Sequence, residues 1–128
     1  MSRIEIKTEK APAAIGPYSQ AILSKDILYL SGQIPMIAET NEIISDDIEM
    51  QIRQTFKNMQ AICDSANAKL TNAVKLSIYL VDLKYFTLLN DIMLEFFNLP
   101  FPARSTIQVS ALPKGVKIEI DAIVAIIF

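Results

Sequence analysis

The chain has 128 residues and a net charge of −2, from 12 basic and 14 acidic residues. This length is typical of one domain, so we expect a single domain over residues 1–128. The charge balance provides no basic surface for a phosphate backbone, which argues against nucleic acid as a partner. No apolar run approaches the ~20 residues that cross a bilayer, and no signal-peptide pattern is seen, so we expect a cytoplasmic protein with no membrane partner.

Two residue types narrow the chemistry further. The chain has no histidine, which removes the usual general base of hydrolases and the commonest metal ligand, so we expect neither a histidine-based triad nor a metal site. The one cysteine, Cys63, falls at an apolar helical position and is interpreted as a core residue. Hydrophobic residues make up 52% of the chain, which predicts that some apolar surface is buried between subunits.

Three strands are predicted in the first third of the chain, where apolar and polar residues alternate over residues 3–7, 18–23 and 27–31. The second and third strands should pair antiparallel through the short polar loop Ser24-Lys25-Asp26. From Ser45 the apolar period becomes 3.6, which predicts a helix of about five turns with Ser45 as its N-terminal cap.

A strand and a second helix follow. Residues 74–80 alternate again, and Asp82 begins an amphipathic helix that ends before a pair of prolines. Two further strands, over residues 104–110 and 117–125, close the chain. The segment Leu112–Gly115 between them has proline second and glycine fourth, which predicts a type I turn and hence a hairpin.

Strand phase indicates where the chemistry lies. The order of elements predicts an α+β fold, with a mixed sheet of the split βαβ type and both helices on one face. Alternation groups Arg104 with Thr106 and Gln108 on one strand, and Glu119 with Asp121 on the next. These polar sets lie opposite apolar ones, such as Ile107, which we expect to face the core. We therefore expect both polar sets on the face without helices, which would then hold the site.

Two charged residues are candidates for binding a small carboxylic acid and for proton transfer to or from it. Arg104 follows the stiff segment Pro100–Ala103, and a guanidinium held this way can bind a carboxylate through two parallel hydrogen bonds. Glu119 lies in an apolar strand, where partial desolvation would raise its pKa and suit it to proton transfer. On residue type alone, an ordinary solvated arginine and an ordinary solvated glutamate remain the alternatives.

Four smaller signals accompany this pair. Tyr18 follows Gly16-Pro17 at a strand start, where a tyrosine more often packs than reacts. Ser31 and Gly32 end the third strand, and a glycine there lets a ligand approach the backbone amides closely. Asn90 interrupts the apolar stripe of the second helix, and a buried amide needs hydrogen-bond partners.

Four segments of the sequence form an ordered set: Ile15–Ala21, Ser31–Pro35, Phe101–Ser105 and Leu112–Ile120. In composition, order and spacing they resemble the signatures of the RidA/YjgF family of reactive-intermediate deaminases. One departure is Thr106, where many members have cysteine. A hydroxyl cannot serve as a thiolate, which argues against thiol chemistry at this position.

The resemblance implies a chorismate-mutase-like fold, assembled as a homotrimer around a central β-barrel with clefts between neighbouring subunits. It implies cofactor-free hydrolysis of small 2-enamine and 2-imine acids, including 2-iminopropanoate and 2-iminobutanoate, to 2-oxo acids and ammonia. The catalytic positions of the family correspond to Arg104, Glu119 and Tyr18. Its substrate-binding positions correspond to Arg104, Ser31, Gly32, Asn90 and Thr106.

Two other functions remain open. A non-enzymatic trimer could bind or sense small 2-oxo acids through the same arginine, although a carboxylate such as Glu119 beside an anion favours turnover over binding. A ribonuclease activity is sometimes attached to the family, but the lack of histidine and the net negative charge argue against it here.

Overall fold

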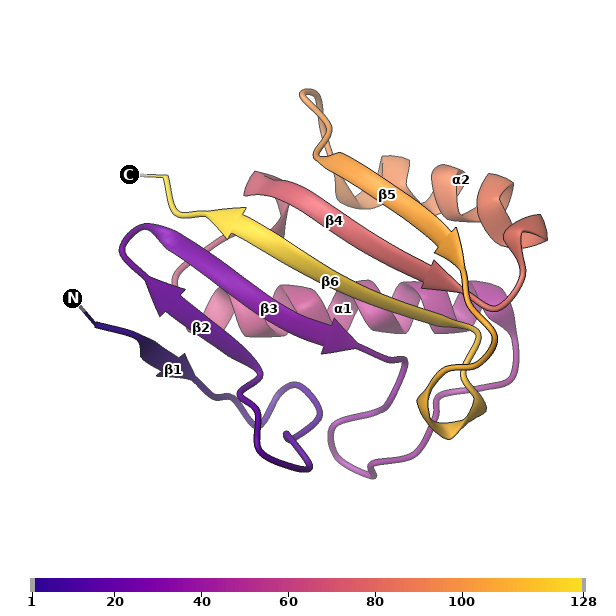
Figure 1. Cartoon of the computed structure of the whole chain (residues 1–128), viewed down its shortest axis with the longest axis horizontal. Helices are drawn as coiled ribbons and strands as arrows, with labels where there is room; N and C mark the ends of the chain where they lie inside the picture. The colour runs from indigo at the N-terminus through magenta and orange to yellow at the C-terminus, as the bar shows by residue number, and fades with distance from the viewer. Residues whose placement is uncertain (1, 128) are drawn as a thin grey trace.

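The computed structural model describes residues 2–127, which form one six-stranded sheet and two α-helices (Figure 1). The strands are β1 (Ile4–Ile6), β2 (Ala21–Ser24), β3 (Ile27–Gln33), β4 (Ala73–Leu80), β5 (Ala103–Gln108) and β6 (Ile118–Ala125). The helices are α1 (Ile48–Ser65) and α2 (Phe86–Phe96). Short 3₁₀ segments lie at Leu70–Asn72, Leu83–Tyr85 and Pro113–Gly115. Neither α-helix in this part of the chain has the length and hydrophobicity of a membrane span.

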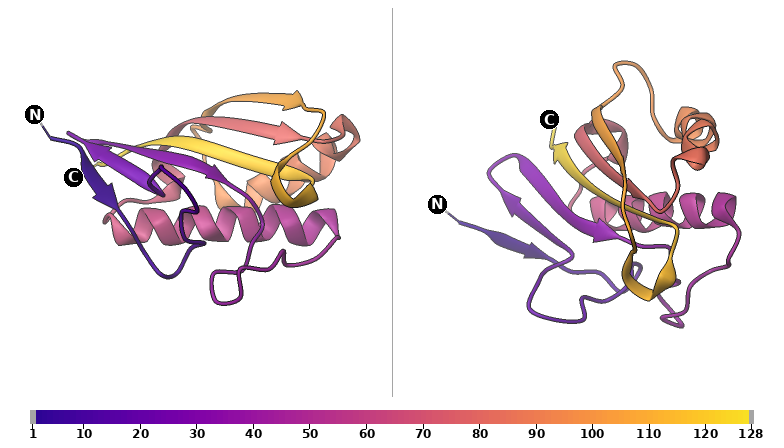
Figure 2. Two further views of the ribbon diagram at one scale, coloured as in Figure 1. Left: turned by 60° about the horizontal axis from the view of Figure 1, so that its bottom comes forward. Right: turned by 45° about the vertical axis from the view of Figure 1, so that its right-hand side comes forward.

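The strand order in the sheet is β1-β2-β3-β6-β4-β5. β2 and β3 form the predicted antiparallel hairpin. β3 and β4 each pair antiparallel with β6 and are joined through α1, whereas β4 and β5 run parallel and are joined through α2. This is the predicted split βαβ arrangement. Both helices cover one face of the sheet, and the other face is bare (Figure 2).

The core lies between the sheet and the two helices. On α1 the helical period places Ile52, Phe56, Met59 and Cys63 inward, and all four are fully buried. The ring of Phe56 lies 5.0 Å from that of Phe96 on α2, centroid to centroid, so aromatic packing joins the helices. Cys63 is a core residue as predicted, and burial raises the pKa of its thiol to about 12.

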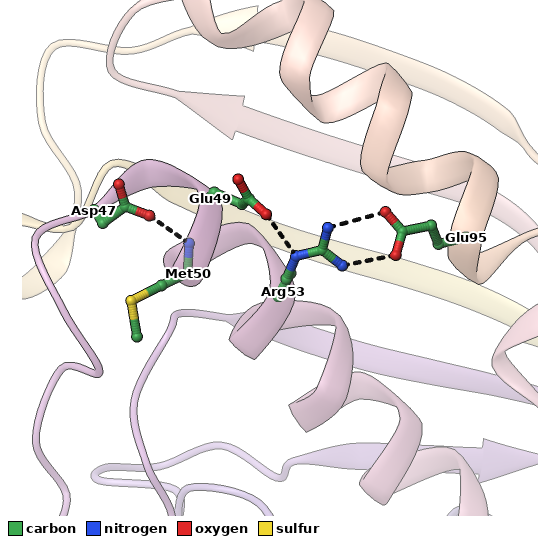
Figure 3. A network of polar contacts seen from close by, with 5 residues as sticks. All are labelled: Asp47, Glu49, Met50, Arg53 and Glu95. Carbon is green, nitrogen blue, oxygen red and sulfur yellow. Dashed lines mark hydrogen bonds and ion pairs between the residues drawn. The ribbon is translucent and has the colours of Figure 1, made fainter.

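A charged contact also joins the helices (Figure 3). Arg53 of α1 donates two hydrogen bonds to the carboxylate of Glu95 on α2, at 2.8 and 2.9 Å, and one to Glu49 at 3.1 Å. The two-pronged geometry defines the position of one helix against the other more closely than a single contact would. Because both carboxylates are exposed, the contact orients α2 and contributes little to stability.

The cap of the first helix differs from the prediction. Asp47 is the N-terminal cap, and its side chain accepts a hydrogen bond from the backbone N of Met50 at 3.0 Å. Ser45 lies two residues earlier, where its hydroxyl accepts a hydrogen bond from the backbone N of Asp47 at 3.0 Å. The prediction of Ser45 as the cap was wrong because serine and aspartate cap equally well, and the aspartate is closer to the first apolar residue of the helix.

The predicted hairpin between the last two strands is wrong. β6 lies between β3 and β4, so within residues 2–127 β5 pairs with β4 alone and forms an edge of the sheet. The turn itself exists, since the backbone N of Gly115 donates to the carbonyl of Leu112 at 3.2 Å. Lys114 has a φ of 57°, however, which a type I turn excludes. The turn redirects the chain without pairing its flanking strands, because β5 already pairs in parallel with β4.

Candidate functional site

Arg104 lies on the helix side of the edge strand β5. In the parallel register it is beside Leu76 of β4, which is fully buried against the helices. The prediction that Arg104, Thr106 and Gln108 lie on the helix-free face is therefore wrong. The apolar Ile107, which was expected to face the core, is 50% exposed on the bare face. At this edge α2 covers the strand with polar and aromatic groups, so apolar residues of β5 need not point inward.

The side chain of Arg104 is held by three residues of α2. Its Nη1 donates to Oδ1 of Asn90 at 2.8 Å and contacts the sulfur of Met93 at 3.2 Å. The guanidinium carbon lies 4.9 Å from the centroid of the Phe86 ring, a cation–π contact. Among residues 2–127, Nε and Nη2 have no hydrogen-bond partner, so one edge of the guanidinium is available to a planar anion. Burial lowers the pKa of Arg104, but an arginine stays charged at neutral pH.

A cavity of about 270 Å³ opens beside this guanidinium. Its lining comes from α2 and from the start of β5 with the loop before it: Asn90, Met93, Leu94, Phe101, Pro102 and Arg104. The side chains of Asn90 and Arg104 are bonded to each other, and the rest of the wall is hydrocarbon and sulfur. The arginine predicted to bind a carboxylate therefore lies at the side of an apolar cavity.

Glu119 lies on the bare face of β6, beside Tyr79 of β4. Its carboxylate lies against the backbone of Gly32. A Cβ atom at residue 32 would lie 2.1 Å from Oε2 of Glu119 and 2.9 Å from its Cδ. A glycine is thus needed for the carboxylate to lie here. The pKa of Glu119 is raised, first by desolvation and then by the negative charge of Asp121, which favours the desolvated carboxylate over the solvated one.

The segment before β2 presents Tyr18 and is tied to β3. Tyr18 is 51% exposed, and its hydroxyl accepts a hydrogen bond from the backbone N of Ile15 at 3.2 Å. It shares a cavity of about 350 Å³ with Gly32. Ser31 donates from Oγ to the carbonyl of Ser19 at 2.5 Å. Ser31 therefore braces this segment against β3, while the ring of Tyr18 faces solvent at the cavity.

Gln20 is a buried residue that the sequence analysis missed. Its side-chain amide donates to the carbonyls of Thr8, Ala11 and Pro12, at 3.0, 3.3 and 2.8 Å. Its Oε1 accepts from the backbone N of Thr8 at 2.8 Å. One side chain therefore holds the loop that precedes Tyr18. The available signal was its position in the same motif as Tyr18.

The predicted site residues form two half-sites in one chain. The arginine half-site comprises Arg104 and Asn90. The glutamate half-site comprises Tyr18, Ser31, Gly32 and Glu119. Arg104 on β5 lies at the same level of the sheet as Ala122 on β6, and β4 lies between them. Ala122 is three residues after Glu119 on β6, so Arg104 and Glu119 are two strands and three residues apart. At ~4.8 Å per strand and ~3.3 Å per residue, the Cα atoms of Arg104 and Glu119 are on the order of 14 Å apart. Because their side chains leave opposite faces of the sheet, one small acid cannot contact both within a chain.

Thr106 follows Arg104 on the same side of β5, and its hydroxyl is buried without a hydrogen-bond partner in residues 2–127. Since an unpaired buried hydroxyl costs free energy, we expect Thr106→Val to raise the free energy of unfolding by about 1 kcal/mol. Thr106→Ser, which keeps the hydroxyl, should show no gain when the variants are unfolded in urea. A valine variant less stable than the wild type would mean that the hydroxyl is paired in solution.

Comparisons with known proteins agree with this architecture. Residues 8–126 match the family model described as Endoribonuclease L-PSP. A 2-iminobutanoate/2-iminopropanoate deaminase from Dermatophagoides farinae is 46% identical over 121 residues, 94% of each chain. The crystal structure of RidA from the Antarctic bacterium Psychrobacter sp. PAMC 21119 is 42% identical and has a TM-score of 0.93, covering 97% of this chain and 100% of that one. E. coli TdcF, solved with bound serine, is 35% identical with a TM-score of 0.89, covering 95% of this chain and 98% of that one.

The family match covers nearly the whole chain, and the relatives share both its length and its fold. The matched segment contains Ser31, Arg104 and Glu119. The chain therefore belongs to the RidA/YjgF family, whose model bears the description Endoribonuclease L-PSP.

Proposed function

We propose that the chain hydrolyses 2-imino acids, formed from 2-enamine acids by tautomerisation, to 2-oxo acids and ammonia without a cofactor. This proposal rests on the hydrogen bonding and the position of the Arg104 side chain. Its Nη1 is bonded to Asn90, while Nε and Nη2, which have no partner in the described part of the chain, can hold a carboxylate beside a cavity. The name of the D. farinae relative and the serine bound in TdcF support a small imino or amino acid as the ligand.

The protein need not activate the imine carbon strongly, because the carbon of a protonated imine is already electrophilic. Water adds to that carbon and loses a proton, while the electrons of the C=N bond move to nitrogen. A proton delivered to nitrogen then lets the C–N bond break. The added hydroxyl gives its remaining proton to the departing ammonia, which leaves as ammonium, and the carbonyl of the 2-oxo acid remains. Glu119 suits both transfers because its pKa is raised: it accepts the proton of the water as a carboxylate and returns it as an acid. Arg104 would hold the substrate within reach.

The two half-sites must come from different copies of the chain, and we propose that they meet in the clefts of a homotrimer. β5 is an edge strand, so its Arg104 is accessible to the glutamate half-site of a neighbouring copy. The bare face of the sheet supports such packing, because Tyr29 is 47% exposed there and Ile107 is equally open to solvent. A central barrel formed by three such faces would bury both side chains.

The test is a coupled assay. A threonine dehydratase acting on threonine generates 2-iminobutanoate, the purified chain is added, and semicarbazide-trapped imine and free ammonia are followed over time. The proposed function predicts faster loss of imine and earlier release of ammonia with the wild-type chain. If the chain leaves the rate of imine loss at the uncatalysed value, the proposed function is wrong.

A trimeric binder of small 2-oxo acids is the second candidate, because the serine bound in TdcF shows that a relative holds an amino acid. Saturable binding of 2-oxobutanoate, with no acceleration of imine loss, would identify this function. The family description names an endoribonuclease, but the chain has no histidine and a net charge of −2, which favours the deaminase over RNA cleavage.

Gly32→Ala is expected to lower kcat by about 100-fold or more while the chain stays folded. The added Cβ would meet the end of the Glu119 side chain, which is flexible and can swing away from its position. Gly115→Ala is the matched control, since Gly115 has open space around it but a φ of 69°. That variant should lose about 1 kcal/mol of stability through backbone strain. Normal turnover in folded Gly32→Ala would show that the position of the carboxylate does not matter.

A further inference from the structure

The cavity beside Arg104 has a chemical character that imine hydrolysis alone does not require. Apart from the bonded pair Asn90 and Arg104, its wall is entirely apolar. Two of its members are large apolar side chains open to solvent, with Leu94 65% and Phe101 46% exposed. Exposed apolar side chains gathered around a hollow beside a cation are typical of a surface that binds the hydrocarbon part of a ligand.

The fixed guanidinium determines how an acid lies in this cavity. Asn90 and Met93 occupy Nη1, so a carboxylate must come to Nε and Nη2. The carbon next to the carboxylate then bears two groups, its nitrogen and its side chain. The apolar wall offers the nitrogen no hydrogen bond, but it removes a hydrocarbon side chain from water. The side chain therefore lies against the wall, and the imine carbon faces outward.

We propose that the preferred substrates are 2-imino acids with branched aliphatic or aromatic side chains, such as those derived from leucine and phenylalanine, and that 2-iminopropanoate is a poorer substrate. This inference rests on the proposed deaminase function. The cavity of about 270 Å³ has room for about nine water molecules, which is more than the smallest imino acid fills. Each further methylene buried against the wall favours the larger substrate by about fourfold.

The experiment compares three imines in one assay. An amino-acid oxidase acting on alanine, leucine or phenylalanine generates the matched imine, and kcat/KM is obtained from the loss of trapped semicarbazone. We expect kcat/KM for the leucine-derived imine to exceed that for 2-iminopropanoate by about tenfold or more. Equal values, or a preference for the smaller imine, would overturn the inference and leave the deaminase function standing. Failure to accelerate any of the three would overturn the function itself.

Two variants test whether the cavity wall causes the preference. Leu94→Gln is expected to bring the ratio of the two kcat/KM values close to one, because an amide replaces hydrocarbon at the wall. Leu94 is largely exposed, so the fold should tolerate the change. Met50→Gln makes a comparable change on an exposed residue of α1 outside the cavity and should keep the ratio. A ratio that Leu94→Gln leaves unchanged would show that the side chain binds elsewhere.

Discussion

Replacing Arg104 by alanine is expected to lower kcat/KM for 2-imino acids by about 100- to 1,000-fold while the protein stays folded. Within residues 2–127, the Nε and Nη2 atoms of the guanidinium have no hydrogen-bond partner and can bind a carboxylate, and loss of a partly desolvated charge contact costs about 3 to 4 kcal/mol. Its own contacts to Asn90 and Phe86 lie at the sheet edge, so stability should change little. The coupled imine assay measures the first quantity, and urea unfolding measures the second.

Two further variants separate charge from geometry at this position. Arg104→Lys keeps the positive charge but lacks the planar fork, so it should recover only part of the activity. Arg3→Ala, at an exposed arginine outside both half-sites, should match the wild type. If Arg104→Ala unfolds, the arginine is structural; if it turns over normally, the carboxylate is held elsewhere.

Glu119→Gln is expected to lower kcat by about 100- to 10,000-fold, because an amide cannot take the proton of the attacking water. Carboxylate binding should persist, since Arg104, which is proposed to hold the carboxylate, is unchanged. The two effects are measured as kcat in the imine assay and as the Kd of 2-oxobutanoate by calorimetry. Unchanged turnover would remove Glu119 from the mechanism.

The same substitution should stabilise the folded chain at neutral pH. Desolvation and the charge of Asp121 raise the pKa of Glu119 in the folded state above its value in the unfolded chain. Between these two pKa values the folded state holds more proton, so wild-type stability falls as the pH rises through this window and stays lower above it. Glutamine does not titrate. The gain of Glu119→Gln should therefore be present at about pH 7 and absent at about pH 4, below the ordinary glutamate pKa.

Urea unfolding of both proteins at the two pH values measures this difference. A gain of the same size at both values would mean that packing, and not titration, is its cause. A loss at neutral pH would show that the carboxylate is stabilised by the fold and would contradict the raised pKa.

The helices and the β2–β3 hairpin could be predicted from local sequence patterns, because each of them is determined by residues that are close together in the chain. The polar loop between β2 and β3 allows only a tight reversal, and their pairing is confirmed. The helical stripe through Phe56 and Cys63 is likewise confirmed, since both are buried. The pairing of β5 was not predictable from its own sequence. It depends on β6 entering between β3 and β4, and the turn Leu112–Gly115 contains no information about which strand its neighbours join.

For the site, the sequence suggested candidate residues, but it did not place Arg104 on the correct face of the sheet. The phase of Arg104 was inferred from Ile107, an apolar residue assumed to face the core, and an edge strand breaks that assumption. The bond between Arg104 and Asn90 joins β5 to α2, so no spacing in the sequence reveals it. The raised pKa of Glu119 was predictable, because the apolar residues around it imply desolvation. Gly32 was expected to let a ligand approach, and the structure shows a second reason for a glycine there, since the carboxylate of Glu119 lies against it.

Deamidation of Gln20 would release the loop that precedes Tyr18. The product glutamate would turn a negative oxygen toward the carbonyls of Thr8, Ala11 and Pro12, which now accept hydrogen bonds from the amide. Attraction at these contacts would become repulsion. Because Gln20 is buried, the hydrolysis can proceed only in molecules whose loop has opened. A chemical change at one buried amide would therefore reach the segment that bears Tyr18 while the sheet stays intact.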